Sequence, residues 1–158
     1  MYKRKVRALF LCAGNACGSK MAAAYVGTLG NDWLEALSAG IEAHPPNPHT
    51  LAVMAEDNID ITSQQSMVVT PEMLHWADVV VTVCQHAKEH SPALPAGTQA
   101  VHWLLDDPAK ILATEGDIMQ AYRDVRIEIK RRIIGMIGGL KMMARDSGAE
   151  KQSPKPPP

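Results

Sequence analysis

The fold is decided by the stretch VRALFLCAGNACGSKMAAA, which runs from Val6 to Ala24. Residues 6–11 form a short apolar run, which predicts a buried strand. Residues 18–28 are rich in alanine, which favours a helix. A turn of small residues joins the two segments. A strand followed directly by a helix is the opening unit of an α/β sheet.

The rest of the chain continues this alternation. Further strands are predicted at residues 33–39, 77–83 and 98–104, because these segments are apolar and each ends at a breaking residue or turn. Since crossovers between parallel strands are right-handed, they favour one doubly wound, four-stranded parallel sheet in the order 2-1-3-4.

Capping residues mark the helices between these strands. Asn47 is a plausible cap for a helix at about residues 48–57, and Thr70 followed by Pro71 opens a short one. Apolar residues recur every three or four positions between about 117 and 144, which predicts a long amphipathic helix. Residues 85–97 contain two prolines and a glycine, so a long mobile loop is expected there.

Composition limits the domain organisation and the class of protein. With 158 residues, 46% of them hydrophobic, we expect one α/β domain at residues 1–146 and a disordered, proline-rich tail at 147–158. No apolar run is long enough for a membrane span or a signal sequence, so a cytoplasmic protein that does not bind membranes is expected. Basic and aromatic residues are not interleaved, which disfavours nucleic acid as a partner. Three cysteines suggest thiol chemistry or buried thiols rather than a disulfide framework.

Three reactive residues lie just beyond the carboxyl ends of predicted strands: Cys12, Cys84 and Asp107. Ligands of open α/β sheets bind at this edge. The backbone of residues 12–19 could curl around an anion at the start of a helix, and the helix dipole there would favour a nucleophilic thiolate at Cys12. The loop has neither the Gly-Lys-Ser/Thr of a nucleotide-binding loop nor the glycine spacing of a dinucleotide fingerprint.

Each of these residues also has a purely structural explanation. Cys12 and Cys84 could be small core residues at strand ends, and Cys17 could be packing within a loop. Asp107 could cap the Asp-Pro turn that it opens. The residue pattern alone leaves both explanations open.

Four segments carry a family resemblance. Residues 9–22, LFLCAGNACGSKMA, resemble the phosphate loop of low-molecular-weight protein tyrosine phosphatases and thioredoxin-coupled arsenate reductases. LSAGI at 37–41, DVVVTVC at 78–84 and HWLLDDPA at 102–109 follow in the family's order, so the resemblance covers about residues 5–140. The arsenate reductase branch is more similar, because Cys84 stands at the place of its second redox cysteine. Ala-Lys also follows the Asp-Pro, where the phosphatases usually have tyrosines.

The resemblance implies a phosphotyrosine phosphatase I-like fold and a role for each site residue. Cys12 would be the nucleophile, Ser19 a hydroxyl partner of its thiolate, and Asn15 a brace for the loop. Cys84 would attack the Cys12 adduct, and Asp107 would be the general acid. The oxyanion would bind along Ala13, Gly14, Asn15, Ala16, Cys17, Gly18 and Ser19.

The resemblance also implies the ligands. Arsenate or a phosphate-like oxyanion is expected, with no bound cofactor and no metal. The reductant would be an external thiol, either thioredoxin or a small thiol.

Two positions depart from the family pattern. Gly18 stands where the family has the arginine whose planar fork holds the oxyanion. Ser91 stands where the reductases often have a third cysteine, so a three-cysteine relay is excluded. Residues 8–116 contain no arginine, so Arg4, Arg7 or an arginine of the last helix could compensate only if the fold brings it near.

Three functional hypotheses follow. The first is an arsenate reductase-like enzyme, impaired or altered by loss of the loop arginine. The second is a non-catalytic family member that binds an anion or senses oxidation through its thiols. The third is a low-molecular-weight protein tyrosine phosphatase, which the missing arginine and the Asp-Pro-Ala-Lys sequence disfavour.

Overall fold

Four parallel strands lie at the centre of the protein in the order β2-β1-β3-β4. The computed structural model describes residues 4–110 and 113–146. The strands are β1 (Val6–Cys12), β2 (Leu34–Gly40), β3 (Val79–Thr82) and β4 (Gln99–His102). Every pair of neighbours is parallel. The predicted sheet, its strand order and its direction are confirmed.

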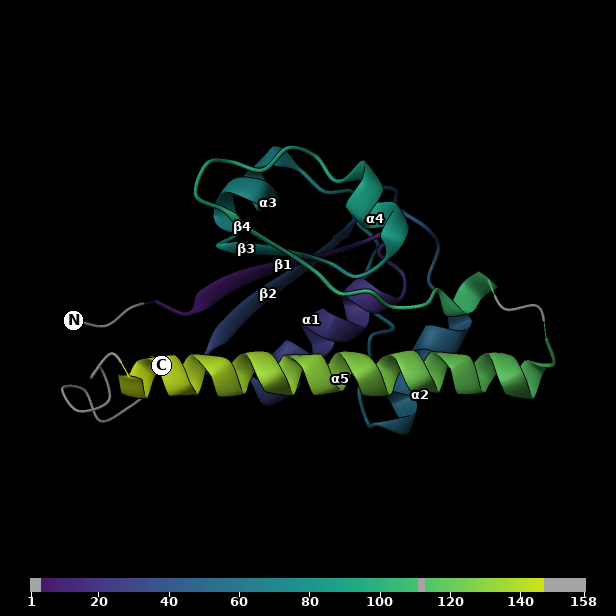
Figure 1. Cartoon of the computed structure of the whole chain (residues 1–158). Coiled ribbons are helices and arrows are strands. Elements are labelled where there is room, and N and C mark those ends of the chain that lie inside the picture. Colours follow the sequence, from purple (N-terminus) through teal and green to yellow (C-terminus); the bar gives the residue numbers. More distant parts are fainter. Residues whose placement is uncertain (1–3, 111–112, 147–158) are drawn as a thin grey trace.

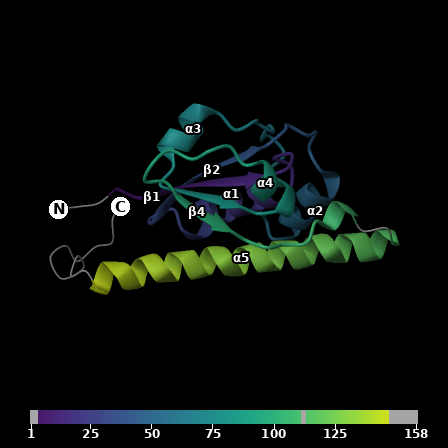
Figure 2. The same cartoon turned by 45° about the horizontal axis from the view of Figure 1, so that its top comes forward.

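Helices cover both faces of the sheet (Figures 1 and 2). One layer contains α1 (Gly18–Leu29), α2 (Pro48–Glu56) and α5 (Glu115–Asp146), and the long α5 lies across the other two. The opposite layer contains the short helices α3 (Pro71–Trp76) and α4 (Gln85–His90). A 3₁₀ turn, η1 (Pro108–Lys110), follows the segment that leaves β4.

Alternate residues of β1 point to the two faces, as a strand requires. Ala8, Phe10 and Cys12 belong to the large core beneath α1 and α5, whereas Leu9 and Leu11 belong to the smaller core beneath α3 and α4. All five are buried. The alternation therefore places the Cys12 side chain on the same face as the helix that follows it.

The predicted helix caps are confirmed. The Asn47 side chain accepts hydrogen bonds from the amides of His49 and Thr50, and the Thr70 hydroxyl accepts one from Met73. These bonds satisfy amides that the first turn of a helix otherwise leaves without partners.

The expectation of a long mobile loop at 85–97 is wrong for its first half, where α4 forms. The Cys84 thiol caps this helix by accepting the amide of Ala87 at 3.4 Å, and Ala87 is fully buried in the smaller core. Both prolines of the segment follow the last helical residue, His90, so neither interrupts the helix. The expected tail, residues 147–158, lies outside the described residues. Of the helices described, none combines the length and hydropathy needed to cross a bilayer.

Candidate active site

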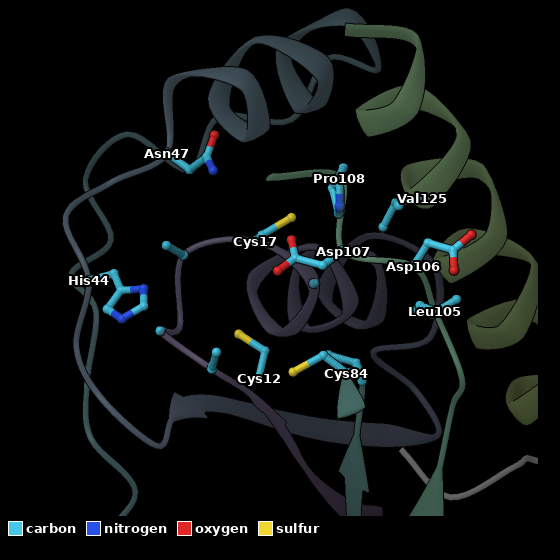
Figure 3. A pocket seen from close by; sticks show the side chains of 15 residues that line it. Cys12, Cys17, His44, Asn47, Cys84, Leu105, Asp106, Asp107, Pro108 and Val125 are labelled. Atoms are coloured by element: carbon cyan, nitrogen blue, oxygen red, sulfur yellow. The ribbon is translucent and has the colours of Figure 1, made fainter. Parts of the chain in front are cut away.

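A pocket opens at the carboxyl edge of the sheet, between β1, β3 and the segment that follows β4 (Figure 3). Strand register explains why the two cysteines meet there, because Leu11 is paired with Thr82 and the Val83 amide donates to the Leu11 carbonyl at 2.9 Å. Cys12 is the last residue of β1, and Cys84 lies in extended backbone two residues beyond β3, so the two are offset by one residue along neighbouring segments. Ideal strand spacing puts their Cα atoms about 6 Å apart.

Most of the site residues expected from the sequence line this pocket. They are Cys12, Ala13, Gly14, Ala16, Cys17, Gly18, Cys84 and Asp107. The other two, Asn15 and Ser19, are fully buried. The structure therefore brings all ten together, eight at the pocket and two buried in the loop that forms its floor.

The loop after β1 turns its carbonyl groups away from the pocket. The carbonyls of Cys12, Ala13 and Gly14 accept the amides of Ile41, Glu42 and His44, at 2.9–3.0 Å. In a trans peptide the amide points opposite to the carbonyl. The amides that follow these carbonyls therefore point to the opposite side, where those of Ala13 and Asn15 meet the Cys84 and Cys12 thiols. Amides grouped in this way ahead of a helix favour negative charge.

The Cys12 thiol lies at the centre of a hydrogen-bond network. The Asn15 amide donates to the Cys12 sulfur at 3.2 Å, and the Ser19 hydroxyl lies 2.8 Å from the same sulfur. The Asn15 side chain donates to Ser19 at 2.9 Å and to Ser38 at 3.0 Å. Asn15 adopts a left-handed backbone conformation with φ of 54°, which asparagine tolerates better than most residues.

Two glycines allow this loop to lie close to its neighbours. A Cβ on Gly40 would lie 2.2 Å from the Glu42 carbonyl oxygen and 2.6 Å from the Asn15 amide nitrogen. A Cβ on Gly14 would lie 2.0 Å from the His44 ring. Backbone atoms of Glu42 and Asn15 thus fill the space that a side chain at position 40 would need. The His44 ring fills the space that a side chain at position 14 would need.

Two thiols join Cys12 at the pocket, and Figure 3 shows Cys12 and Cys84 directed into the same hollow. Burial raises the pKa of Cys84, and the charges of Cys12 and Asp107 raise it further, whereas the amides of Ala87 and Ala13 lower it. Burial also raises the pKa of Cys17, to about 12. Cys17 therefore stays a neutral thiol at neutral pH.

No lysine or arginine is among the described residues that line this pocket, whereas Asp106 and Asp107 both are. Several of the candidate arginines make contacts elsewhere. Arg7 lies over the Trp76 ring and 3.9 Å from a Glu35 carboxylate oxygen. Arg4 forms a bidentate ion pair with Asp78, at 2.6 and 2.7 Å. Arg123 and Arg126 of α5 both pair with Glu56 on α2.

Gly18 is the first residue of α1 and is not among the residues with positive φ. A Cβ built there would lie 2.9 Å from Cγ2 of Val83 and 3.8 Å from Cδ1 of Ile129. The backbone conformation at this position therefore suits residues other than glycine. The Val83 side chain, however, would be in close contact with the Cβ of any such residue.

Sequence reasoning assigned no site role to His44, Asn47 and Ser38. His44 and Asn47 come from the segment before α2 and line the pocket. Ser38 of β2 accepts a hydrogen bond from the Asn15 side-chain amide. Only tertiary contacts reveal them, because each is far from Cys12 in sequence. Among the described residues, no group of three or more histidine, cysteine or acidic side chains could hold a metal ion.

A cysteine in a loop between a parallel strand and a helix is the arrangement typical of cysteine-dependent phosphatases. The chain belongs to the low molecular weight phosphotyrosine protein phosphatase family, whose model matches residues 7–146.

Within that family the chain is similar to arsenate reductases. It is 46% identical to an arsenate reductase of Halalkalibacterium halodurans over 125 residues, which cover 78% of this chain and 89% of the relative. It is 43% identical to one of Bacillus licheniformis, with the same coverage.

Solved structures agree with this placement. An arsenate reductase in the phosphate-binding state is 29% identical with a TM-score of 0.70, covering 85% of this chain and 98% of that one. The low molecular weight protein tyrosine phosphatase of T. tengcongensis is 25% identical with a TM-score of 0.71, covering 85% and 99%. The family resemblance inferred from the sequence is thus confirmed.

Proposed function

We propose that the chain is an arsenate reductase in which Cys12 attacks arsenate and Cys84 resolves the adduct. The observation that carries the proposal is the placement of two cysteines at one pocket, with Cys12 held by the Asn15 amide and the Ser19 hydroxyl. The similarity to arsenate reductases at 43–46% identity supports the same substrate.

In the first step the Cys12 thiolate attacks the arsenic atom of hydrogen arsenate. A sulfur–arsenic bond forms, the bond from arsenic to its hydroxyl group breaks, and the departing hydroxyl takes one proton from Asp107 and leaves as water. Backbone amides of the loop at residues 13–18 and the N-terminus of α1 stabilise the remaining oxyanion. The Ser19 hydroxyl lies 2.8 Å from the Cys12 sulfur, and by donating a hydrogen bond to it would favour the thiolate before attack.

In the second step the Cys84 thiolate attacks the Cys12 sulfur. A sulfur–sulfur bond forms and the sulfur–arsenic bond breaks. Its electron pair stays on arsenic, which leaves as arsenite, so the two cysteines lose two electrons and arsenic gains two. The expected Cα separation of about 6 Å lies within the range of about 4.4–6.8 Å that a disulfide requires. The Ala87 and Ala13 amides are placed to stabilise the Cys84 thiolate.

The cycle closes only when an external thiol reduces the Cys12–Cys84 disulfide. Cys17 is the remaining cysteine of the chain, and burial raises its pKa to about 12. Burial raises the pKa of Cys84 too, but two backbone amides oppose that shift, so Cys17 is the poorer nucleophile. Ser91 follows α4 and carries no thiol. Thioredoxin or a small thiol therefore has to reach the disulfide directly.

The test is arsenate-dependent consumption of reductant by the purified protein, with thioredoxin and its reductase or with a small thiol. We expect arsenite to accumulate at the rate of reductant loss, and both to vanish in Cys12→Ser and in Cys84→Ser. Hydrolysis of an aryl phosphate at a comparable rate, without arsenite formation, would instead identify a phosphatase.

One observation favours a second candidate, a thiol pair that senses oxidation. The described pocket residues include two carboxylates and no lysine or arginine, which weakens the attraction of an arsenate dianion. For a sensor, peroxide should oxidise Cys12 rapidly, and arsenate should neither oxidise thiols nor yield arsenite.

A further inference from the structure

Lys20 occupies an unusual position for a charged residue. It is only 6% exposed, and it is the third residue of α1, where the helix dipole repels a cation. Burial lowers its pKa, whereas the Cys12 charge raises it. A lysine kept at the positive end of a helix and away from water needs compensating contacts and suggests a role.

Its contacts lie beside the loop and not in the pocket. The Lys20 ammonium donates to the Gln65 carbonyl at 2.8 Å and lies 3.5 Å from Oδ1 of Asn15. The Met67 amide donates to the same oxygen at 2.8 Å. Two donors thus converge on one side of the Asn15 side chain.

This convergence determines which way the Asn15 amide points. If its oxygen and nitrogen were exchanged, the NH₂ group would face both Lys20 and the Met67 amide, leaving three donors together. With the oxygen on their side, the NH₂ group is directed at Ser19 and Ser38.

The direction of the Ser19 bond follows. Ser19 accepts a hydrogen from Asn15 at 2.9 Å, so its own hydroxyl hydrogen is available for the Cys12 sulfur at 2.8 Å. A hydrogen bond donated to sulfur favours the thiolate, whereas one accepted from it would favour the neutral thiol. The series of hydrogen bonds that runs from Lys20 through Asn15 and Ser19 to Cys12 therefore has the direction that favours a reactive thiolate.

We propose that Lys20 is a positioning residue. Its ammonium group fixes the orientation of the Asn15 side-chain amide, so that Ser19 donates to Cys12. Its positive charge also stabilises the Cys12 thiolate from outside the pocket. The proposal deepens the function proposed above, because it concerns the nucleophile of that same site. It also gives the site a positive charge that arsenate does not contact.

The test measures the rate of Cys12 alkylation by iodoacetamide at neutral pH, with each cysteine resolved by peptide mass. Lys20→Met keeps the length and packing of the side chain but removes the charge. We expect Cys12 alkylation to slow by roughly 3- to 10-fold, because one charge and the orienting donor are lost together. Lys141→Met removes the same charge from an exposed site near the end of α5 and should change the rate less than about 2-fold.

Chemical rescue separates charge from packing. Lys20→Ala leaves room for a small cation, so added propylammonium should restore much of the Cys12 rate, whereas sodium chloride at equal ionic strength should not. Wild-type rates in Lys20→Met, or equal effects of the two salts on Lys20→Ala, would overturn the proposal. The assay contains no arsenate, so the role of Lys20 can hold even if arsenate reduction fails, and the reverse is equally visible.

Discussion

Placing an arginine at position 18 should give the pocket a cation that none of its described lining residues supplies. Gly18 begins α1 at the floor of the pocket, and its backbone conformation suits any residue. We propose that this glycine stands for the family's oxyanion-binding arginine. Gly18→Arg should therefore strengthen arsenate binding and raise turnover.

Two opposing effects set the size of the gain. Two charge-assisted hydrogen bonds at about 1.5–3 kcal/mol each correspond to roughly 10²–10⁴ in rate. Against this, the new Cβ would lie 2.9 Å from Val83, so the Val83 side chain must move, at a cost of about 1–3 kcal/mol. We expect a net gain of up to about 10²-fold and a fall in Tm of roughly 2–12 °C.

The assay compares arsenate affinity by calorimetry, turnover by arsenite formation, and Tm for a matched set of proteins. Gly18→Ala adds the Cβ without the cation, so it should lose stability and gain no affinity. Gly18→Lys adds a point charge without the fork and should gain less than arginine. Gly18→Arg combined with Val83→Ala removes the close contact and should exceed Gly18→Arg in affinity.

The reasoning fails if folded Gly18→Arg, alone and with Val83→Ala, binds arsenate no more tightly than Gly18→Ala does. Tighter binding without faster turnover would instead indicate an anion-binding protein. That outcome would refute the claim that position 18 limits catalysis.

Three further predictions concern the thiols and the scaffold. Cys17 should be the slowest of the three cysteines to react with iodoacetamide near neutral pH, because burial raises its pKa to about 12. The Cys17→Ser variant should keep reductase activity. Fast labelling of Cys17, or loss of turnover in Cys17→Ser, would contradict this prediction. Gly40→Ala should lower Tm by more than about 6 °C and slow Cys12 labelling, since its Cβ would lie 2.2 Å from a carbonyl oxygen; wild-type behaviour would disprove the close approach. The hydrogen bond from Tyr25, aided by Lys130, lowers the pKa of Asp57, so its stabilisation is present above about pH 4 and is lost as the pH falls through the lowered value. In thermal melts across this range, Asp57→Asn should therefore melt below the wild type at neutral pH, and the difference should close in acid; a constant difference would contradict the linkage.

The sheet was predictable because its signals are local. Apolar β-branched runs such as ADVVVTV at 77–83 mark buried strands, and right-handed crossovers leave few orders for four of them. Helix α4 was missed because its signals are tertiary. A cysteine thiol caps it and one buried alanine anchors it, and neither feature is distinctive in sequence.

The site was predictable as far as motifs reach. Cys12, Cys84 and Asp107 follow strand ends, and parallel strands bring such ends to one edge. The parts contributed by distant segments could not be found in this way. Lys20 lies on a helix near the loop in sequence, but only the fold shows that it is buried against Gln65 and directed at Asn15.

A single-turnover experiment tests the proposed chemistry most directly. The fully reduced protein is mixed with excess arsenate in the absence of oxygen and of any other reductant, and arsenite and remaining thiols are counted. We predict one arsenite per chain, the loss of two thiols, and a disulfide that joins Cys12 to Cys84 on peptide mapping. Arsenite formed at the same yield by Cys84→Ser, or wild-type protein that yields no arsenite and retains all three thiols, would contradict the account.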